Sequence, residues 1–401
     1  MLVRPLSPPK KIATVFEVFR AFLMLGCTGF GGPVAHLAYF RTEFVARRAW
    51  LRDEAYADVV ALCQFLPGPA SSQVGMALGF IRAGVPGAIA AWMGFTVPSA
   101  VLLVLFAEWI SHQRTPADSL WLHGLAVAIV AVLAQALWGM GRTLCPDRLR
   151  AGLAVTAAAA MAWIPGPLTQ TICIVLGGLA GWRWGTPGEA LPSGTFAVSL
   201  GKRTGLGLLC LYGGLLLLPI LIGHRGGDAW RLFNTYYHVG ALVFGGGHVV
   251  LSLLQTSVVP SGTISNEVFL AGYGAAQAVP GPLLTFAAYL GACASRPPNG
   301  LLGATIALVG IFLPSFFLVL GSLPLWGNIR QHAALRRAIP GMNAAVVGLL
   351  LATFYQPVWT SGIHGAPDFA LAMLAFLLLL WRAPSWLVVL MCATAGFAGW
   401  H

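Results

Sequence analysis

Two copies of one helix-breaking motif lie inside long apolar stretches of this chain. The first copy runs Gln64-Phe65-Leu66-Pro67-Gly68-Pro69, and the second runs Gln277-Ala278-Val279-Pro280-Gly281-Pro282, 213 residues later. An α-helix cannot continue through Pro-Gly-Pro. Within a bilayer, the backbone groups that such a break frees are tolerated only where they line a cavity or are buried in protein. The paired breaks therefore predict a transporter.

The composition places both breaks in an integral membrane protein. Hydrophobic residues make up 58% of the 401 residues and charged residues only 9%, and the mean hydropathy is +0.80. Such a chain is expected in the bilayer. Nearly all of the 14 tryptophans lie at the ends of apolar stretches, as expected of an interfacial aromatic belt. We therefore predict an all-α polytopic membrane protein.

The net charge of +11 comes from basic residues between the apolar stretches. Basic residues in such loops set membrane topology, so they indicate no nucleic-acid partner. Residues 1–11 resemble the start of a signal peptide, but the apolar run after them carries Glu17 and Arg20 and lacks a cleavage site, which predicts a retained cytoplasmic N-terminus. The seven cysteines have no CxxC and no metal-ligand spacing, so we expect no metal and no cofactor.

An internal duplication covers almost the whole chain. Three further pairs recur at offsets of 214, 216 and 218: Phe30-Gly31-Gly32 with Phe244-Gly245-Gly246, Pro98-Ser99 with Pro314-Ser315, and Ala180-Gly181-Trp182 with Ala398-Gly399-Trp400. A slowly drifting offset is typical of two copies of one unit separated by small loop insertions. We place the first repeat at 12–182 and the second at 232–401.

The segment 183–231 joins the repeats and contains one unpaired apolar stretch at 206–223. If each repeat crosses the membrane an even number of times, this connecting helix turns the second repeat upside down and gives two inverted-topology repeats. We expect a multi-pass protein of the inner (plasma) membrane with its N-terminus in the cytoplasm and its C-terminus outside.

The basic residues also bear on how the motif stretches lie in the bilayer. The loop with Arg41, Arg47, Arg48 and Arg52 falls outside the cell if every stretch spans the membrane. It moves to the cytoplasmic side, where basic residues are favoured, if the Gly-Gly and Pro-Gly-Pro stretches are re-entrant. We favour broken, re-entrant helices. The alternative is that this loop is an exception to a statistical rule.

Each Pro-Gly-Pro break is followed by a helix start, which is suited to an anion. Residues 70–73 form the first turn after Pro69, where backbone N–H groups have no intrahelical acceptor. In the second copy Thr285 corresponds to Ser72 and retains one hydroxyl. The substrate-binding residues that we predict are Gly31, Gly32, Gln64, Gly68, Pro69, Ser71, Ser72, Gly245, Gly246, Gln277, Gly281, Pro282 and Thr285. The alternative is that Gly and Pro only kink helices or allow close packing.

Five titratable side chains at or near membrane depth are candidates for a charge or proton role. They are Arg20, His36, His248, Glu54 and Glu267. Arg20 could attract an anion or extend to the cytoplasmic interface. The two histidines could donate to an oxyanion, carry a proton or form ordinary interhelical hydrogen bonds. Helix-start electrostatics alone would explain the two glutamates.

Together, these motifs resemble the chromate ion transporter (CHR) family over essentially the full chain. FGGP, an arginine-rich loop and QxxPGP follow one another, and both FGG and QxxPGP recur in the second half. The matching residues are Phe30, Gly31, Gly32, Pro33, Gln64, Pro67, Gly68, Pro69, Phe244, Gly245, Gly246, Gln277, Pro280, Gly281 and Pro282. Gly247 replaces Pro33 and Leu284 replaces Ser71 in the second copy, so that half is expected to contribute less to ligand contact.

The resemblance implies a two-domain chromate efflux protein that gives chromate resistance, formed from two related halves in opposite orientation. Moving two negative charges out of a cell that is negative inside is favourable by roughly 4.6 kcal/mol per 100 mV. The chain has no GxxxxGKS/T phosphate loop, so the expected mechanism is secondary transport by alternating access.

Other functions share part of this pattern. Sulfate resembles chromate in size and charge, so an uptake carrier for sulfate or another oxyanion is the main alternative, and a passive channel is another. A membrane-embedded enzyme is not expected, because the chain has no HExxH and no paired carboxylates at catalytic spacing. Besides the oxyanion and membrane lipid, small-residue faces such as Gly177 and Gly181 permit a homodimer without requiring it.

Overall fold

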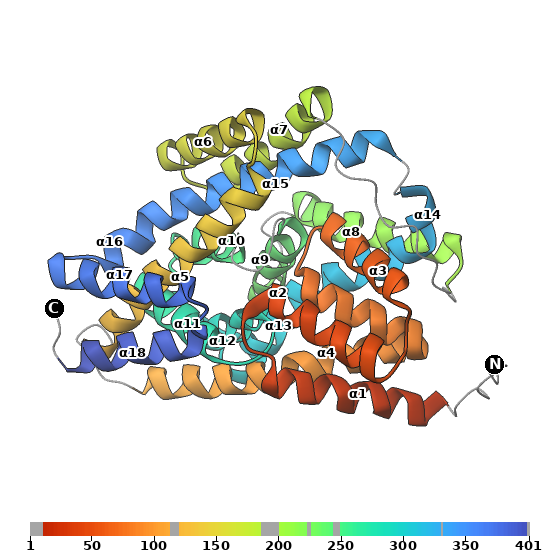
Figure 1. The fold of residues 1–401 in the computed structure, drawn as a ribbon, viewed down its shortest axis with the longest axis horizontal. Coiled ribbons are helices and arrows are strands. Elements are labelled where there is room, and N and C mark those ends of the chain that lie inside the picture. The colour runs from red at the N-terminus through yellow and green to blue at the C-terminus, as the bar shows by residue number, and fades with distance from the viewer. Residues whose placement is uncertain are drawn as a thin grey trace.

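The computed structural model describes residues 11–112, 120–185, 200–222, 226–243, 249–329 and 332–398. Within these ranges the chain is helical and contains no β-strand, which confirms the predicted all-α class (Figure 1). We call α1–α7 the first half and α9–α18 the second half.

The helices of the first half are broken near its beginning and longer near its end. They are α1 (Lys11–Thr28), α2 (Gly32–Phe40), the π-helix η1 (Arg41–Arg47), α3 (Asp53–Phe65), α4 (Ala70–Ser111), α5 (Leu120–Leu144), α6 (Arg148–Trp163) and α7 (Pro167–Trp184). A separate helix, α8 (Lys202–Ile222), covers most of the apolar stretch that was expected to connect the repeats.

The second half repeats the same order with more interruptions. Its elements are α9 (Asp228–Leu242), α10 (Val249–Val258), α11 (Asn266–Ala278), η4 (Leu283–Thr285), α12 (Phe286–Ala292), α13 (Gly300–Ser322), η5 (Leu323–Leu325), α14 (Trp326–Ile329), α15 (Ala333–Thr353), η6 (Phe354–Trp359), α16 (Thr360–Gly362), α17 (Ala366–Leu380) and α18 (Ser385–Phe397). The third helix of each half, α3 or α11, ends just before Pro-Gly-Pro.

Among the described residues, four helical segments are long and apolar enough to cross a membrane by length and composition. They are Ala70–Ser111, Trp121–Leu144, Gly300–Ile329 and Ala333–Gly362. The segments that carry the FGG and QxxPGP motifs are instead divided into shorter helices.

The longest helix, α4, is two helices joined at a sharp bend. Ala83 (φ −141°, ψ 18°) and Gly84 (φ 68°, ψ −157°) leave helical geometry. In a straight helix Gly79 and Gly87 would lie about 12 Å apart along the axis. Here a Cβ built on either glycine would collide with the carbonyl oxygen of the other. The chain therefore folds back on itself at the bend.

The second half folds back at the same place, between α12 and α13. A Cβ built on Gly291 would collide with the carbonyl oxygen of Gly303, and one built on Gly303 would collide with that of Gly291. Each half therefore contains a short helix packed against a long one. The difference is that a loop joins the two helices in the second half, whereas the first half makes a bend.

The start of the first half forms a helical hairpin. The Phe22 ring of α1 lies 5.4 Å from the Phe40 ring and 4.7 Å from the Phe44 ring, centroid to centroid. Earlier in α1, Glu17 lies 3.6 Å from Arg48, which follows η1. Because earlier residues of α1 contact later residues of the returning segment, the two run antiparallel, with residues 29–31 at the tip.

A second type of hairpin turns at Pro-Gly-Pro. In the second half the Phe269 ring of α11 lies 5.1 Å from the Phe286 ring of α12, and the Tyr289 hydroxyl donates to the Val268 carbonyl at 2.9 Å. This places residues 279–282 at the tip. In the first half α3 packs against α4, with residues 66–69 between them.

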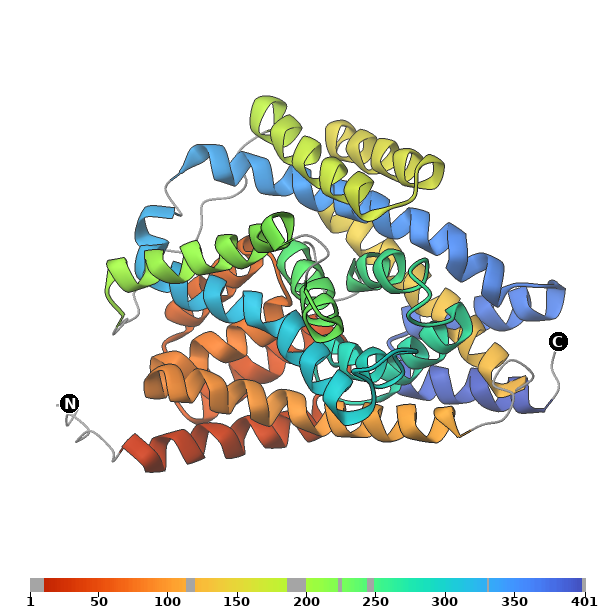
Figure 2. The ribbon, with the colours of Figure 1, turned by 180° about the vertical axis from the view of Figure 1, so that it is seen from behind.

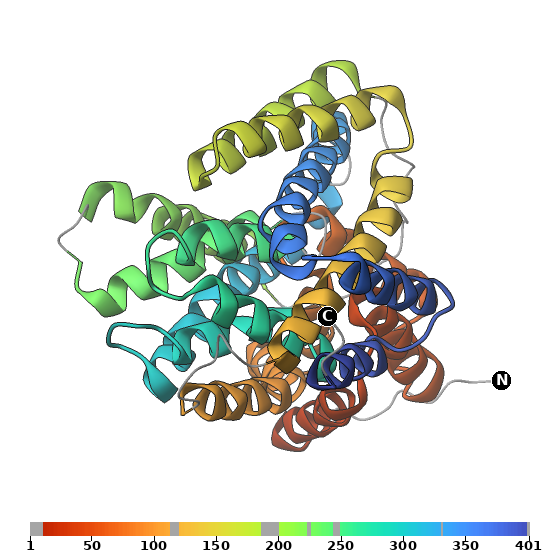
Figure 3. The same cartoon turned by 90° about the vertical axis from the view of Figure 1, so that its left-hand side faces the viewer.

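Long helices of each half pack against helices of the other half. Helix α5 of the first half packs against α11, α17 and α18 of the second, and α15 of the second half packs against α6 and α7 of the first (Figure 1, Figure 2). Helix α8 lies beside α9 and α13 (Figure 3). One buried apolar core accordingly runs through both halves.

Glycines allow these exchanged helices to approach closely. A Cβ built on Gly341 of α15 would collide with the Gly177 carbonyl oxygen and lie 2.9 Å from Gly181 Cα, both on α7. The small-residue face of α7 that was considered for a homodimer is therefore covered by α15 of the same chain. That face gives the homodimer no support.

We predict that Gly341→Ala lowers the thermal unfolding midpoint of the purified protein, because the added methyl overpacks the α7–α15 crossing at a cost of about 1–3 kcal/mol. The control is Gly139→Ala, where a Cβ meets nothing within 4 Å and the change should be neutral or stabilising in a helix. Equal midpoints for the two variants would contradict the close packing.

Candidate functional site

Hairpin tips from the two halves meet through two matching backbone hydrogen bonds. The N–H of Gly68 donates to the carbonyl of Val243, which follows α9, with 2.6 Å between the nitrogen and the oxygen. The N–H of Gly281 donates to the carbonyl of Gly29, which follows α1, at 3.0 Å. Each Pro-Gly-Pro break is thus bonded to the chain beside the FGG motif of the opposite half. The two bonds satisfy N–H and carbonyl groups that have no partner within a helix.

Glycine is required at the centre of both Pro-Gly-Pro tips. Gly68 has φ 125° and Gly281 has φ 107°, a region that L side chains rarely adopt. A Cβ on Gly281 would lie 2.8 Å from Ser99 Oγ, and one on Gly68 would lie 2.8 Å from Ser315 Oγ. The serines of the recurring Pro-Ser pairs therefore lie directly behind the tip of the opposite half.

The start of α4 buries a row of polar side chains behind the first tip. Ser71, Ser72 and Gln73 are at most 3% exposed. The amide nitrogen of Gln73 donates to the Pro67 carbonyl at 2.6 Å and lies 3.4 Å from Ser315 Oγ. Ser72 Oγ and Gln73 Oε1 have no hydrogen-bond partner among the described residues, and Pro69 provides no side-chain cap. An uncapped helix start with a free buried hydroxyl is suited to an anion.

The second part of α4 adds another buried hydroxyl. Thr96 is fully buried, and its Oγ1 has no partner among the residues that the structure describes. The carbonyl of the preceding Phe95 lies 3.3 Å from a Cβ built on Gly281, and the Thr96 carbonyl accepts from Ser99 Oγ at 3.0 Å. Thr96 therefore belongs to the turn of α4 that packs against the tip 279–282.

His36 connects the glycine tip of α1–α2 to this polar region. Its side chain is buried, and Nε2 lies 2.9 Å from the Gly29 carbonyl oxygen, which can only accept, so Nε2 carries the proton. Nδ1 lies 3.5 Å from Ser71 Oγ. The same Gly29 carbonyl accepts from Gly281. His36 thus orients the group that receives the second Pro-Gly-Pro tip.

The second half offers fewer free polar groups at its tip. Pro282 is followed by the 3₁₀ turn η4 rather than by an α-helix. Thr285, the counterpart of Ser72, is buried and donates its hydroxyl to the Pro282 carbonyl at 2.7 Å. Gln277 is half-buried, and its Nε2 has no partner among the described residues.

Several predicted residues lie away from the tips or outside the described ranges. Gln64, Arg20, Glu54 and Glu267 have exposed side chains. Gly31 and Gly32, with φ of 101° and 75°, make the turn into α2. Gly245, Gly246 and His248 lie outside the residues that the structure describes.

Four of the buried polar residues at the tips were not among the predicted site residues. They are Gln73, Thr96, Ser99 and Ser315. The recurrence of Pro98-Ser99 as Pro314-Ser315 is a sequence signal for the two serines, although a duplication alone also explains it. Gln73 lies in the predicted helix start, and its contact with Ser315, 242 residues away, gives no local sequence signal.

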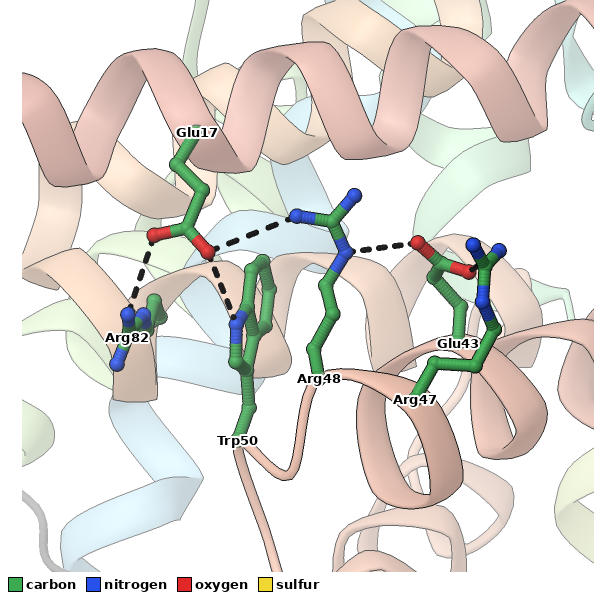
Figure 4. A network of polar contacts seen from close by, with 6 residues as sticks. All are labelled: Glu17, Glu43, Arg47, Arg48, Trp50 and Arg82. Atoms are coloured by element: carbon green, nitrogen blue, oxygen red, sulfur yellow. Dashed lines mark hydrogen bonds and ion pairs between the residues drawn. The ribbon is translucent and has the colours of Figure 1, made fainter.

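An ionic network holds the base of the α1–α2 hairpin (Figure 4). Glu43, which is 4% exposed, accepts from Arg47 at 2.6 Å and from Arg48 at 2.7 Å. Glu17 accepts from Arg82, beside the bend in α4, at 3.1 Å and from the Trp50 indole at 3.3 Å. The arginine-rich loop therefore ties α1, η1 and α4 together. Both carboxylates are matched by arginines.

A separate ion pair closes the same loop. Arg41 donates two hydrogen bonds of 2.7 Å to the Asp53 carboxylate at the start of α3. These hydrogen bonds hold the pKa of Asp53 below its ordinary value, so the carboxylate stays charged at neutral pH. Because both side chains are largely exposed, the pair orients the loop more than it stabilises the fold.

One cluster has side chains of the kind that bind metals. His123, His364 and Asp368 bring ligand atoms within 4.8 Å of one another. Asp368 already accepts from His123 Nε2 at 2.8 Å and from the backbone N–H of His364 at 2.9 Å. These bonds join α5 to the start of α17, which gives the cluster a structural explanation without an ion.

Comparison with known proteins gives one family and several relatives that match over most of their length. A family model described as "Chromate transporter" matches residues 16–182 and 230–397. The chain is 27% identical over 395 residues to a chromate transport protein of Pseudomonas aeruginosa, covering 96% of this chain and 91% of the relative. It is 24% identical over 354 residues to one of Cupriavidus metallidurans, covering 84% and 81%. No solved structure matches the chain.

We predict that Gly281→Ala destabilises the protein more than Gly262→Ala. Both glycines have positive φ, so both variants carry backbone strain, but only a Cβ on Gly281 meets an atom within 4 Å. The additional cost should be about 1–3 kcal/mol, measured as the difference in thermal unfolding midpoint of the purified variants. If Gly262→Ala is destabilised as much, the tips are not packed as described.

We also predict that Glu43→Gln lowers the unfolding midpoint, because the neutral amide leaves Arg47 and Arg48 without a buried carboxylate. Hydrogen bonds to charged groups contribute about 1.5–3 kcal/mol. The control is Glu108→Gln, since Glu108 is exposed on α4. A midpoint for Glu43→Gln that equals that of the control would show that the network adds no stability.

Proposed function

We propose that this chain, which belongs to the chromate transporter family, exports chromate from the cytoplasm by alternating access at its hairpin tips. Membership of the family makes the chain a multi-pass membrane transporter and not an enzyme. Its relatives in Pseudomonas aeruginosa and Cupriavidus metallidurans carry the name chromate transport protein, which supports chromate as the substrate here.

The observation that carries the proposal is the pair of hydrogen bonds from Gly68 to Val243 and from Gly281 to Gly29. Each bond joins a break in one half to the chain beside a break in the other. A ligand held between the tips would contact both halves at once. Movement of the tips would then change its access to the two sides of the membrane.

The proposed ligand contacts lie mainly in the first half. The hydroxyls of Ser72 and Thr96 are buried donors without partners among the described residues. Together with the backbone N–H groups at the start of α4, they could replace part of the hydration shell of an oxyanion. The Thr285 hydroxyl already donates to the Pro282 carbonyl, so we assign Thr285 a smaller part in binding than Ser72.

The tips are closed against each other in this structure, which supports a gating role for them. The position of a Cβ on Gly68 is occupied by Gln73 and Ser315, and that on Gly281 by Ser99. In the proposed mechanism an ion passes when these contacts separate. Separation of one pair at a time would expose the ligand to one side of the membrane at a time, as alternating access requires.

Export is the direction that the membrane potential favours for a dianion. We propose that the N-terminus and the loop of Arg41, Arg47 and Arg48 lie in the cytoplasm, that the two halves are inverted, and that the broken helices are re-entrant. The antiparallel α1–α2 hairpin supports this arrangement, because it returns the chain to the side from which α1 starts. Sulfate, with the same shape and charge, should compete.

The test is uptake of labelled chromate into everted membrane vesicles that contain the protein, with sulfate as competitor. We expect accumulation in wild-type vesicles and at least about tenfold lower uptake efficiency in Ser72→Ala, since one hydrogen bond to a charged ligand contributes about 1.5–3 kcal/mol. The matched control is Ser111→Ala, at an exposed serine that bonds only within its own helix end.

The possible outcomes test the proposed substrate and the proposed binding site separately. Failure of wild-type vesicles to accumulate chromate would reject the proposed substrate and direction. Accumulation that Ser72→Ala and Ser111→Ala leave equally unchanged would keep the function and reject the start of α4 as the binding site. Insertion of each variant is checked by its amount in the membrane fraction.

A further inference from the structure

A polar pocket opens in the second half beside the N-terminal part of α9. It encloses about 270 Å³ between α9, the end of α10 and the loop that joins α12 to α13. Its lining includes Arg231, Tyr236, Ser257, Ser261 and Arg296. With the rise of a helix, Arg231 lies about 18 Å along α9 from Val243. This α9 pocket is therefore separate from the hairpin tips.

The α9 pocket corresponds to the ionic network of the first half. The family model matches two segments that begin at residues 16 and 230, and at this offset of 214 Arg231 stands where the first half has Glu17. Arg296 lies on the loop that corresponds to the bend of α4, where Arg82 lies. In the first half these positions hold a carboxylate paired with an arginine at 3.1 Å, whereas in the second half both hold arginines.

The other carboxylate of the network is also missing from the second half. At the same offset Ser257 stands where Glu43 accepts from two arginines. The acid that remains is Asp228, which pairs with Arg231 at 2.9 Å. Arg296 has no carboxylate partner among the described residues. The pocket thus has two arginines and one aspartate. Every arginine of the first-half network contacts a carboxylate, whereas Arg296 leaves one positive charge in the pocket unpaired among the described residues.

Tyr236 provides a buried donor in the lining of the same pocket as the unpaired Arg296. It stands where the first half has Phe22. The two residues also pack in the same way: Phe22 lies against Gly94 in the first half, and Tyr236 lies against Gly310 in the second. Tyr236 is fully buried, lines the pocket, and its hydroxyl has no hydrogen-bond partner among the described residues. A buried hydroxyl without a partner is unfavourable unless a ligand or water satisfies it.

We propose that the α9 pocket binds a small tetrahedral oxyanion, as a site through which the substrate passes between the surface and the hairpin tips. Arg231 and Arg296 supply the charge, and the guanidinium forks and the Tyr236 hydroxyl supply the donors. The Ser257 hydroxyl is already donated to the Leu253 carbonyl at 2.7 Å, so it lines the site without adding a donor. The identity of the ion rests on the proposed function, whereas the presence of an anion site does not.

The experiment measures protection of a thiol placed in the pocket. Ser261→Cys is chosen because Ser261 is exposed and lines the pocket. The purified full-length variant is treated with a thiol reagent with and without sulfate, with gluconate keeping the ionic strength constant. Wild-type protein gives the background from its own cysteines. We expect sulfate to slow labelling of Ser261→Cys and to leave Ala46→Cys, at an exposed place in the corresponding part of the first half, unchanged.

A second change tests the charge argument. Arg231→Glu in the Ser261→Cys background restores the glutamate of the first half opposite Arg296, and we expect the sulfate concentration for half-protection to rise at least about tenfold. Lys202→Glu makes the same charge change at the start of α8 and should have no effect.

Equal labelling with and without sulfate would overturn the proposal. So would protection that persists in Arg231→Glu, or that extends to Ala46→Cys. Labelling requires no transport, so protection by sulfate in a protein that fails to accumulate chromate in vesicles would support this site and reject the proposed function separately.

Discussion

The structure depends on the need of a broken helix for hydrogen-bond partners away from water. Pro-Gly-Pro and the glycine breaks free backbone groups that no helix can satisfy, and in hydrocarbon each such group is costly. Gly68 and Gly281 solve this by donating to the chain beside the breaks of the opposite half. Neither half can complete its own tips, so the breaks that could have destabilised the fold are what require the halves to associate.

The exchange of long helices limits how this protein can move. Because α5 packs against α17 and α18 while α15 packs against α6 and α7, the halves are interlocked and cannot separate as two rigid blocks without breaking the core. The Glu17 and Glu43 network anchors the base of one hairpin, whereas the hairpin tips meet the opposite half through the backbone hydrogen bonds of Gly68 and Gly281. We infer that the hairpins, rather than whole halves, are the moving parts.

Sequence alone predicted the class, the places of the breaks and the family, because helix-breaking residues and apolar runs act locally. It did not predict which polar side chains lie behind the tips. Gln64 was predicted from its place in the motif, yet it is exposed, whereas Gln73 is fully buried and reaches Ser315 of the other half. Such contacts depend on the packing of segments more than 200 residues apart, which no local pattern specifies. Nor does a local pattern specify that Ser99 lies behind Gly281, which is 182 residues further along the chain.

The difference between the two Pro-Gly-Pro tips affects how the two related halves can evolve separate roles. α4 begins as a regular helix with a free serine hydroxyl after its Pro-Gly-Pro, whereas the second half begins with the 3₁₀ turn η4 and a threonine that satisfies itself. In an assembly of two identical chains, any change at one tip would appear at both. Joining the copies in a single polypeptide removes that constraint, so mutation can alter the energy barrier facing one side of the membrane while the barrier facing the other side keeps its height.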